Sequence, residues 1–318
     1  MVDPLQKYDP ELRQMLLDSE VERSSLQVDA IADLKRTFVS GGLESVLTPK
    51  LEAVEWSTPA RDGHEVALTT LTPRGVTPRA AIFHIHSGGM MAGDRFMGFD
   101  QIAAWAERFD LVACSVEYRL APEHPYPYPQ DDSYAGLIAF SDSVQAQWPG
   151  LPLIITGMSA GGGLAAGVAL RARDEQGPHI NAQLLMCPML DESNDTPSSH
   201  QYSGCGIWDR ESNEVGWNAL LGESRHTDSV SATASPALAK DLSGLPPTFL
   251  DCGSEEVFRS EIVDYADRLA ASGVAVELHV WSGAFHGFDL SFPTATVSRH
   301  AVDARAHWLD RMLKEIIS

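Results

Sequence analysis

The sequence predicts an α/β protein in which a mostly parallel central sheet is flanked by helices. Two observations carry this prediction. Short apolar runs, typical of buried parallel strands, recur along the chain. Helical patterns alternate with several of these runs, as they do in sheets built from strand–helix–strand units. A chain of 318 residues is long enough for one such core with insertions.

The predicted strands are short, and most are almost wholly apolar. They lie at residues 66–73, 80–89, 111–118, 151–163 (where the strand ends in a glycine-rich turn), 182–188, 247–253 and 274–281. The predicted helices cover residues 165–176, 254–273 and 297–318, and the second of them ends at a glycine, a common helix terminator.

Two segments depart from this alternation. Residues 4–40 carry apolar side chains at loosely helical spacing, whereas residues 190–245 are polar, rich in Ser, Gly and Pro, and poor in strand patterns. We therefore predict N-terminal helices in residues 1–45 that form part of a cap, and a cap insertion in residues 190–245. Residues 46–189 and 246–318 are expected to form the core.

The composition is that of an ordinary globular protein, with 44% hydrophobic and 21% charged residues. A formal net charge of −21 disfavours nucleic acid and anionic membranes as partners. The first residues lack a basic patch followed by an apolar stretch, so we expect no secretory signal and a cytoplasmic protein. Three of the four cysteines, Cys114, Cys187 and Cys252, lie in apolar runs and are expected to be buried thiols without disulfides or zinc-site spacing.

The strongest local motif is Gly157-Met158-Ser159-Ala160-Gly161, which follows an apolar strand and opens a helix. It matches the G-x-S-x-G turn, in which a serine hydroxyl is exposed between a strand and a helix. Small neighbours are required because bulkier side chains would clash in so tight a turn. Ser159 is therefore the predicted nucleophile, and the alternative is an ordinary glycine-rich loop.

Two consecutive glycines, Gly88 and Gly89, follow another predicted strand. Consecutive glycines allow the backbone to turn its N–H groups toward a ligand. Together with the N–H of Ala160, they would form an oxyanion hole, in which one donor is worth about 3 kcal/mol in the transition state. A plain turn is the alternative interpretation.

The predicted general base is His286, which lies on a glycine-flanked loop just after the last strand. The chain order nucleophile, acid, histidine is the one expected for a G-x-S-x-G hydrolase. An acid is needed to orient the imidazole and to stabilise the imidazolium. Asp251, Glu255 and Glu256 all lie in the right region, and the residues alone do not choose among them.

Four blocks of the chain, in order, resemble those of the hormone-sensitive-lipase-like esterases of the α/β-hydrolase superfamily. They are HSGGMMAGD (86–94), YRLAPEHPYPYPQDD (118–132), GMSAGGGLA (157–165), and GSEEVF (253–258) with GAFHGF (283–288). The resemblance implies the α/β-hydrolase fold with a helical cap, Ser159 as nucleophile, His286 as base, and an oxyanion hole at Gly88, Gly89 and Ala160. It places the acid at Glu256, because the family pattern G-x-x-D-x-L has its acid three residues after a glycine, and Gly253 stands at that glycine. In the second block, Glu123 is expected to brace the two glycine loops.

The resemblance also implies an activity. It indicates a serine carboxylic-ester hydrolase that acts through an acyl-enzyme on small or medium uncharged esters, without cofactor or metal. Lactone hydrolysis, or the tailoring of a secondary metabolite, would use the same groups. A non-catalytic small-molecule receptor on the same fold is a further alternative, disfavoured because serine and histidine are both present. Dimers are common among the similar proteins, so the resemblance allows a homodimer.

Overall fold

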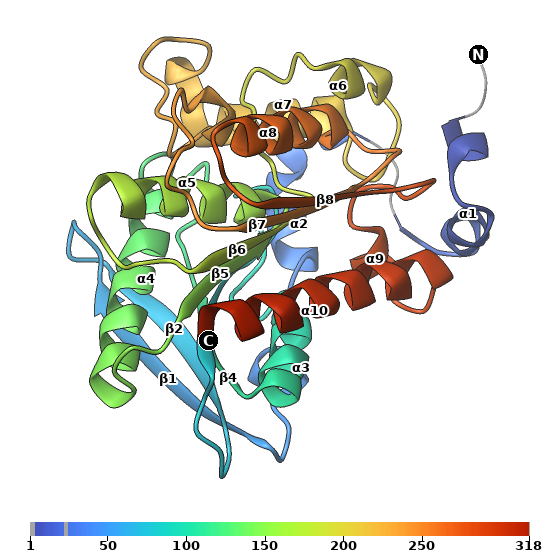
Figure 1. The fold of residues 1–318 in the computed structure, drawn as a ribbon. Helices are drawn as coiled ribbons and strands as arrows, with labels where there is room; N and C mark the ends of the chain where they lie inside the picture. The colour runs from blue at the N-terminus through green and yellow to red at the C-terminus, as the bar shows by residue number, and fades with distance from the viewer. Residues whose placement is uncertain (1–3, 22–24, 318) are drawn as a thin grey trace.

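The computed structural model describes residues 4–21 and 25–317 and contains an eight-stranded sheet in the order β1-β2-β4-β3-β5-β6-β7-β8 (Figure 1). The strands are β1 Leu51–Pro59, β2 Glu65–Pro73, β3 Ala80–Ile85, β4 Leu111–Val116, β5 Leu153–Met158, β6 Ala182–Met186, β7 Thr248–Gly253 and β8 Val276–Trp281. Strand β2 runs antiparallel to both of its neighbours, and every other neighbouring pair is parallel. The predicted fold class is confirmed.

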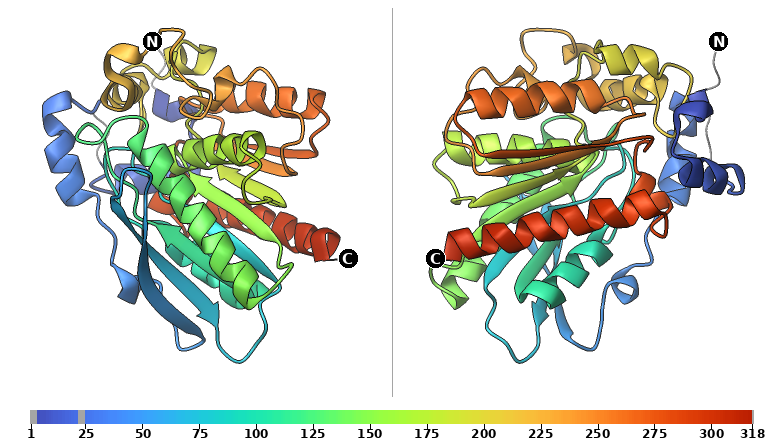
Figure 2. Two further views of the ribbon diagram at one scale, coloured as in Figure 1. Left: turned by 90° about the vertical axis from the view of Figure 1, so that its left-hand side faces the viewer. Right: turned by 45° about the vertical axis from the view of Figure 1, so that its right-hand side comes forward.

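Long helices cover both faces of the sheet (Figures 1 and 2). On one face lie α4 Tyr128–Gln147, α5 Ala160–Asp174 and α8 Arg259–Ala271, and on the other lie α3 Phe99–Phe109 and α10 Thr296–Ile317. Because both faces are covered, every residue of the five strands from β3 to β7 is buried. This explains the continuous apolar runs from which these strands were predicted.

All seven predicted strands are present, but β1 was missed. It is an edge strand with one buried residue, Leu51, and its remaining side chains are partly or fully exposed, so it lacks an apolar signal. Helices α3 and α4 were also not predicted. All four cysteines are free thiols, and Cys114, Cys187 and Cys252 are buried as expected.

The N-terminal segment is less helical than its pattern indicated. Its described part contains two short helices, α1 Pro10–Leu17 and α2 Ile31–Thr37, with 3₁₀ turns at Pro4–Lys7 and Val28–Ala30. Residues 1–3 and 22–24 of the predicted N-terminal unit lie outside the described residues.

The polar insertion carries two helices, α6 Pro197–Gln201 and α7 Arg210–Leu221, and 3₁₀ turns at Gly222–Ser224 and Pro236–Leu238. It contacts the N-terminal segment, because the N–H of Leu26 donates to Ser212 Oγ at 2.9 Å. The division into a cap and a core stays a prediction. Within the described part of the chain, no helix has both the length and the apolar character needed to cross a bilayer.

Candidate active site

Ser159 occupies a strained turn between β5 and α5. Its backbone angles are φ 55° and ψ −121°, a conformation that a residue with a side chain adopts only when its surroundings impose it. The Ser159 N–H donates to the Met186 carbonyl at 2.8 Å, which fixes the turn to β6. A Cβ on Gly157 would lie 2.2 Å from the Gly161 carbonyl oxygen, so the turn closes only with glycine there.

The histidine at position 286 reaches this serine across 127 residues of sequence. His286 Nε2 lies 2.9 Å from Ser159 Oγ, within hydrogen-bond distance. The histidine sits on the loop between β8 and the short helix α9 Phe288–Ser291, and the ring of Phe258 meets its imidazole edge-on at 5.0 Å. The predicted nucleophile and base are therefore brought together.

Of the three candidate acids, Glu256 lies next to the imidazole. Its Oε2 is 3.6 Å from His286 Nδ1, and its side chain is fully buried. The N–H of Gly253 donates to the same oxygen at 3.1 Å and holds the carboxylate in place. Neither His286 Nδ1 nor Glu256 Oε1 has a hydrogen-bond partner among the described residues. The separation is longer than a hydrogen bond, as is common for catalytic pairs without substrate.

The other two acids have different partners. Asp251 accepts hydrogen bonds from Arg305 Nε at 2.8 Å and from the indole N–H of Trp281 at 3.0 Å. Glu255 accepts from the hydroxyl of Tyr202 and from Ser254 Oγ. Within the described part of the chain, neither carboxylate pairs with His286. Asp251 and Glu255 therefore have partners outside the candidate triad.

The three backbone N–H groups predicted for the oxyanion hole lie on the glycine loop after β3 and at the start of α5. Gly88 and Gly89 have φ angles of 116° and 62°, which turn the backbone after β3. Their N–H groups, and that of Ala160, donate to no acceptor among the described residues. Unpaired donors at a helix N-terminus and a glycine loop form an anion-binding surface. These are the donors predicted for the oxyanion hole.

Sequence reasoning missed the residue that supports this glycine loop. The hydroxyl of Tyr118 donates to the His86 carbonyl at 3.0 Å, and its ring stacks on the His86 imidazole at 4.1 Å. Burial lowers the pKa of His86 to about 4, so the stacked imidazole is neutral near pH 7. Tyr118 begins the YRLAPE block, and that resemblance was the available signal.

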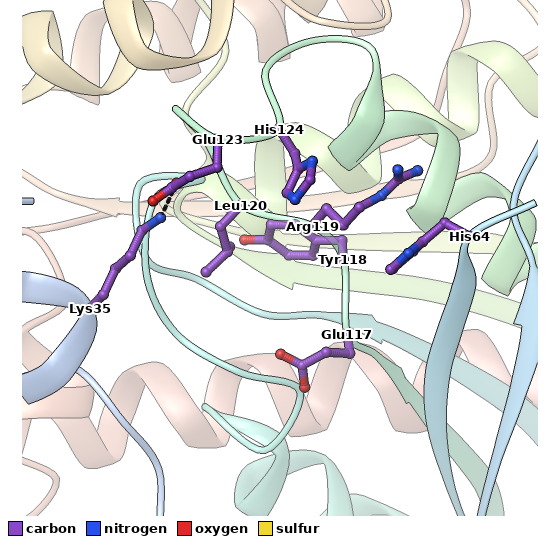
Figure 3. Close-up of a pocket in the computed structure, with 8 residues that line it drawn as sticks. All are labelled: Lys35, His64, Glu117, Tyr118, Arg119, Leu120, Glu123 and His124. Carbon is purple, nitrogen blue, oxygen red and sulfur yellow. Dashed lines mark hydrogen bonds and ion pairs between the residues drawn. The ribbon is translucent and has the colours of Figure 1, made fainter. Parts of the chain in front are cut away.

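The bracing role expected of Glu123 is wrong. Its side chain is 61% exposed and pairs with Lys35 of α2 at the rim of a surface cavity of about 350 Å³ (Figure 3). The cavity lies along the segment after β4, and neither Ser159 nor His286 lines it. Glu123 thus links the YRLAPE block to the N-terminal segment and not to the glycine loops.

Comparisons with known proteins identify the fold and the family of this chain. A family model described as the alpha/beta hydrolase fold matches residues 82–290. The chain is 35% identical to carboxylesterase NlhH of Mycobacterium tuberculosis over 65% of its length, and this match spans 66% of that protein, just under two thirds. It is 30% identical to arylacetamide deacetylase of Bos taurus, over 74% of each protein.

Solved structures match over nearly the whole chain. A bacterial heroin esterase superposes with a TM-score of 0.89 and 32% identity, covering 98% of this chain and 99% of that one. The esterase LipW of Mycobacterium marinum gives a TM-score of 0.84 at 28% identity, covering 97% and 96%. The fold and these relatives define an α/β hydrolase. Within that superfamily, the chain belongs to the hormone-sensitive-lipase-like family.

Proposed function

We propose that this protein hydrolyses small or medium uncharged carboxylic esters, with Ser159, His286 and Glu256 as its catalytic triad. The observation that carries the proposal is the 2.9 Å contact between His286 Nε2 and Ser159 Oγ on a strained strand-to-helix turn. The buried carboxylate of Glu256 on the far side of the imidazole supports its role as the acid. The relatives named above, called carboxylesterase and esterase, support the reaction class.

In the first half of the reaction, Ser159 Oγ attacks the ester carbonyl carbon while His286 Nε2 accepts the hydroxyl proton. The carbonyl oxygen becomes an alkoxide and accepts hydrogen bonds from the N–H groups of Gly88, Gly89 and Ala160. The tetrahedral intermediate then expels the alcohol, which takes the proton from His286, and the acyl group stays on Ser159.

In the second half, water replaces the alcohol. His286 takes a proton from water as its oxygen adds to the acyl carbon, and the same three N–H groups bind the alkoxide. Collapse releases the carboxylic acid, and Ser159 Oγ recovers its proton from His286. The carboxylate of Glu256 stabilises the imidazolium in both halves by its negative charge.

Substitution of the nucleophile tests the proposal. Ser159→Ala should abolish turnover of p-nitrophenyl acetate and labelling by a fluorophosphonate probe, whereas Ser282→Ala, on the histidine loop, should retain both. Turnover that persists in the folded Ser159→Ala protein would refute the assignment. A wild-type protein that neither turns over esters nor accepts the probe would favour the receptor alternative.

The substrate range and setting are part of the proposal. The net charge of −21 disfavours anionic esters, so a neutral ester should be hydrolysed faster than an analogue carrying a carboxylate. A screen across ester chain lengths and lactones separates simple esterase activity from lactonase activity. The cytoplasmic location and the homodimer stay predictions, to be checked by cell fractionation and by light scattering.

A further inference from the structure

A third potential metal ligand lies beside the histidine and acid of the candidate triad. The Sγ of Cys187, a carboxylate oxygen of Glu256 and a ring nitrogen of His286 all lie within 4.8 Å of one another. It is the one group of three such ligands found among the described residues. Cys187 has no part in acyl transfer as proposed above, so its place here needs a separate account.

We infer that Cys187, Glu256 and His286 form an inhibitory site for a thiol-binding divalent cation such as zinc. Thiolate sulfur, imidazole nitrogen and carboxylate oxygen are the three ligand types that zinc uses in proteins, often with water as the fourth ligand. The inference rests on the proposed function, because the cation would occupy two members of the triad.

Two unsatisfied atoms point to a ligand at this position. His286 Nδ1 and Glu256 Oε1 are buried and have no hydrogen-bond partner among the described residues. Leaving a buried polar atom unpaired is unfavourable, so a bound cation that coordinates these groups would recover part of that cost. The Glu256 side chain is fully buried, and this atom cannot be satisfied by bulk water.

The charge around Cys187 also favours a cation. The carboxylates of Glu256, Asp289 and Asp251 act electrostatically on the buried Cys187 thiol, and the guanidinium of Arg305 opposes them. Three carboxylates against one guanidinium leave a local excess of negative charge. A dication bound here would displace the proton of the Cys187 thiol, which would pass to solvent.

Coordination would stop catalysis in a specific way. Ligands of tetrahedral zinc lie roughly 3.5 Å apart, so the three groups would have to draw together from their present spacing. Nδ1 is the His286 nitrogen that faces Glu256, and metal bound there leaves the remaining proton on Nε2. An imidazole with a proton on Nε2 cannot accept one from Ser159, and movement of the ring toward Cys187 would lengthen the 2.9 Å contact.

The test titrates Zn²⁺ and Cd²⁺ against esterase activity in wild type, Cys187→Ser and Cys187→Ala, with Cys205→Ser as the matched control. Cys205 is the partly exposed cysteine and, among the described residues, belongs to no such cluster. Wild type and Cys205→Ser should lose at least 90% of their activity at micromolar metal and recover it with EDTA. The Cys187 variants should keep their basal activity and need at least tenfold more metal for half-inhibition.

A measurement independent of turnover separates this inference from the proposed function. In Ser159→Ala, Cd²⁺ should produce the ultraviolet absorption of a cadmium–thiolate bond and raise Tm, and both effects should vanish in Ser159→Ala/Cys187→Ser. The inference is wrong if the Cys187 variants are as metal-sensitive as wild type, or if wild type gives neither inhibition nor a cadmium–thiolate band. A Cys187-dependent band in a protein without esterase activity would uphold the site and reject the proposed function.

Discussion

Replacing Glu256 by glutamine removes the negative charge beside His286 and keeps the shape of the side chain. The carboxylate oxygen lies 3.6 Å from Nδ1. At an effective dielectric constant of about 20, a unit charge at that distance stabilises the imidazolium by about 4.6 kcal/mol. Since about 1.4 kcal/mol corresponds to a factor of ten in rate, Glu256→Gln should lower kcat by roughly 10³-fold.

The assay is kcat for p-nitrophenyl butyrate, with Glu255→Gln as the matched control. Glu255 is the adjacent residue, but it hydrogen-bonds to Tyr202 and Ser254, so its neutral variant should lose less than about tenfold. Folding of each variant is verified by near-ultraviolet circular dichroism. A larger loss of kcat in Glu255→Gln than in Glu256→Gln, with both proteins folded, would refute the assignment of the acid.

Three further predictions concern stability and specificity. Gly157→Ala should lower the free energy of unfolding in urea by at least about 3 kcal/mol, because the added Cβ would collide with backbone atoms. Gly150→Ala, whose Cβ would stand in open space, should lower it by about 1 kcal/mol, and equal losses in the two variants would contradict the packing argument. The Trp208 indole packs on the glycine loop, because a Cβ on Gly89 would lie only 2.7 Å from the Trp208 ring, and removing it should make room for a longer acyl chain. Trp208→Ala should therefore raise kcat/KM for p-nitrophenyl octanoate relative to acetate by about tenfold, and an unchanged chain-length profile would exclude Trp208 as a wall of the site. Burial lowers the pKa of His84 from 6.5 to about 4, so as pH falls the imidazole of the unfolded chain is protonated before that of the folded protein, and about 3 kcal/mol of folding stability is lost between pH 6.5 and 4. Urea unfolding of His84→Gln should therefore show a flatter pH dependence than wild type. An identical slope in the two proteins would contradict the burial effect.

The sequence predicted those parts of the site whose signals are local. Ser159 stands in a five-residue motif, and Gly88 and Gly89 are adjacent. Gly157 is required by a contact inside that motif, whereas a Cβ on Gly161 would meet the carbonyl oxygen of Ile85, at the end of β3. His286 was identified by its position after the last strand, since the parallel topology brings strand ends to one edge of the sheet. The serine and glycine predictions therefore depend on short motifs, whereas the histidine prediction depends on the topology of the sheet.

The choice of acid depends on partners that are distant in sequence. Asp251 is occupied by Arg305, 54 residues away, and Glu255 by Tyr202, 53 residues away. Nothing in the local pattern shows that these partners exist, so composition and spacing left three acids open. The family resemblance narrowed the choice to Glu256, and the structure places that carboxylate next to the imidazole.

Tyr118 and β1 escaped prediction for related reasons. The hydrogen bond from Tyr118 to His86 spans 32 residues and is visible only once β3 and β4 are paired. Strand β1 belongs to the sheet through its antiparallel pairing with β2 and not through an apolar face of its own. Long-range pairing overrides local propensity in both cases.

Helix α1 carries no chemical group of the site, but it packs directly on the loop that holds His286. The N–H of Asp9 donates to the Gly283 carbonyl at 2.8 Å, and the rings of Tyr8 and Phe285 lie 5.2 Å apart. Leu12 is fully buried in the same cluster, and burying one such side chain is worth about 2 kcal/mol. Because the loop is bound to α1 on one side and to Ser159 on the other, displacement of α1 would move the base away from the nucleophile. The position of the His286 imidazole therefore depends on contacts made by the N-terminal segment as well as on the loop that carries it.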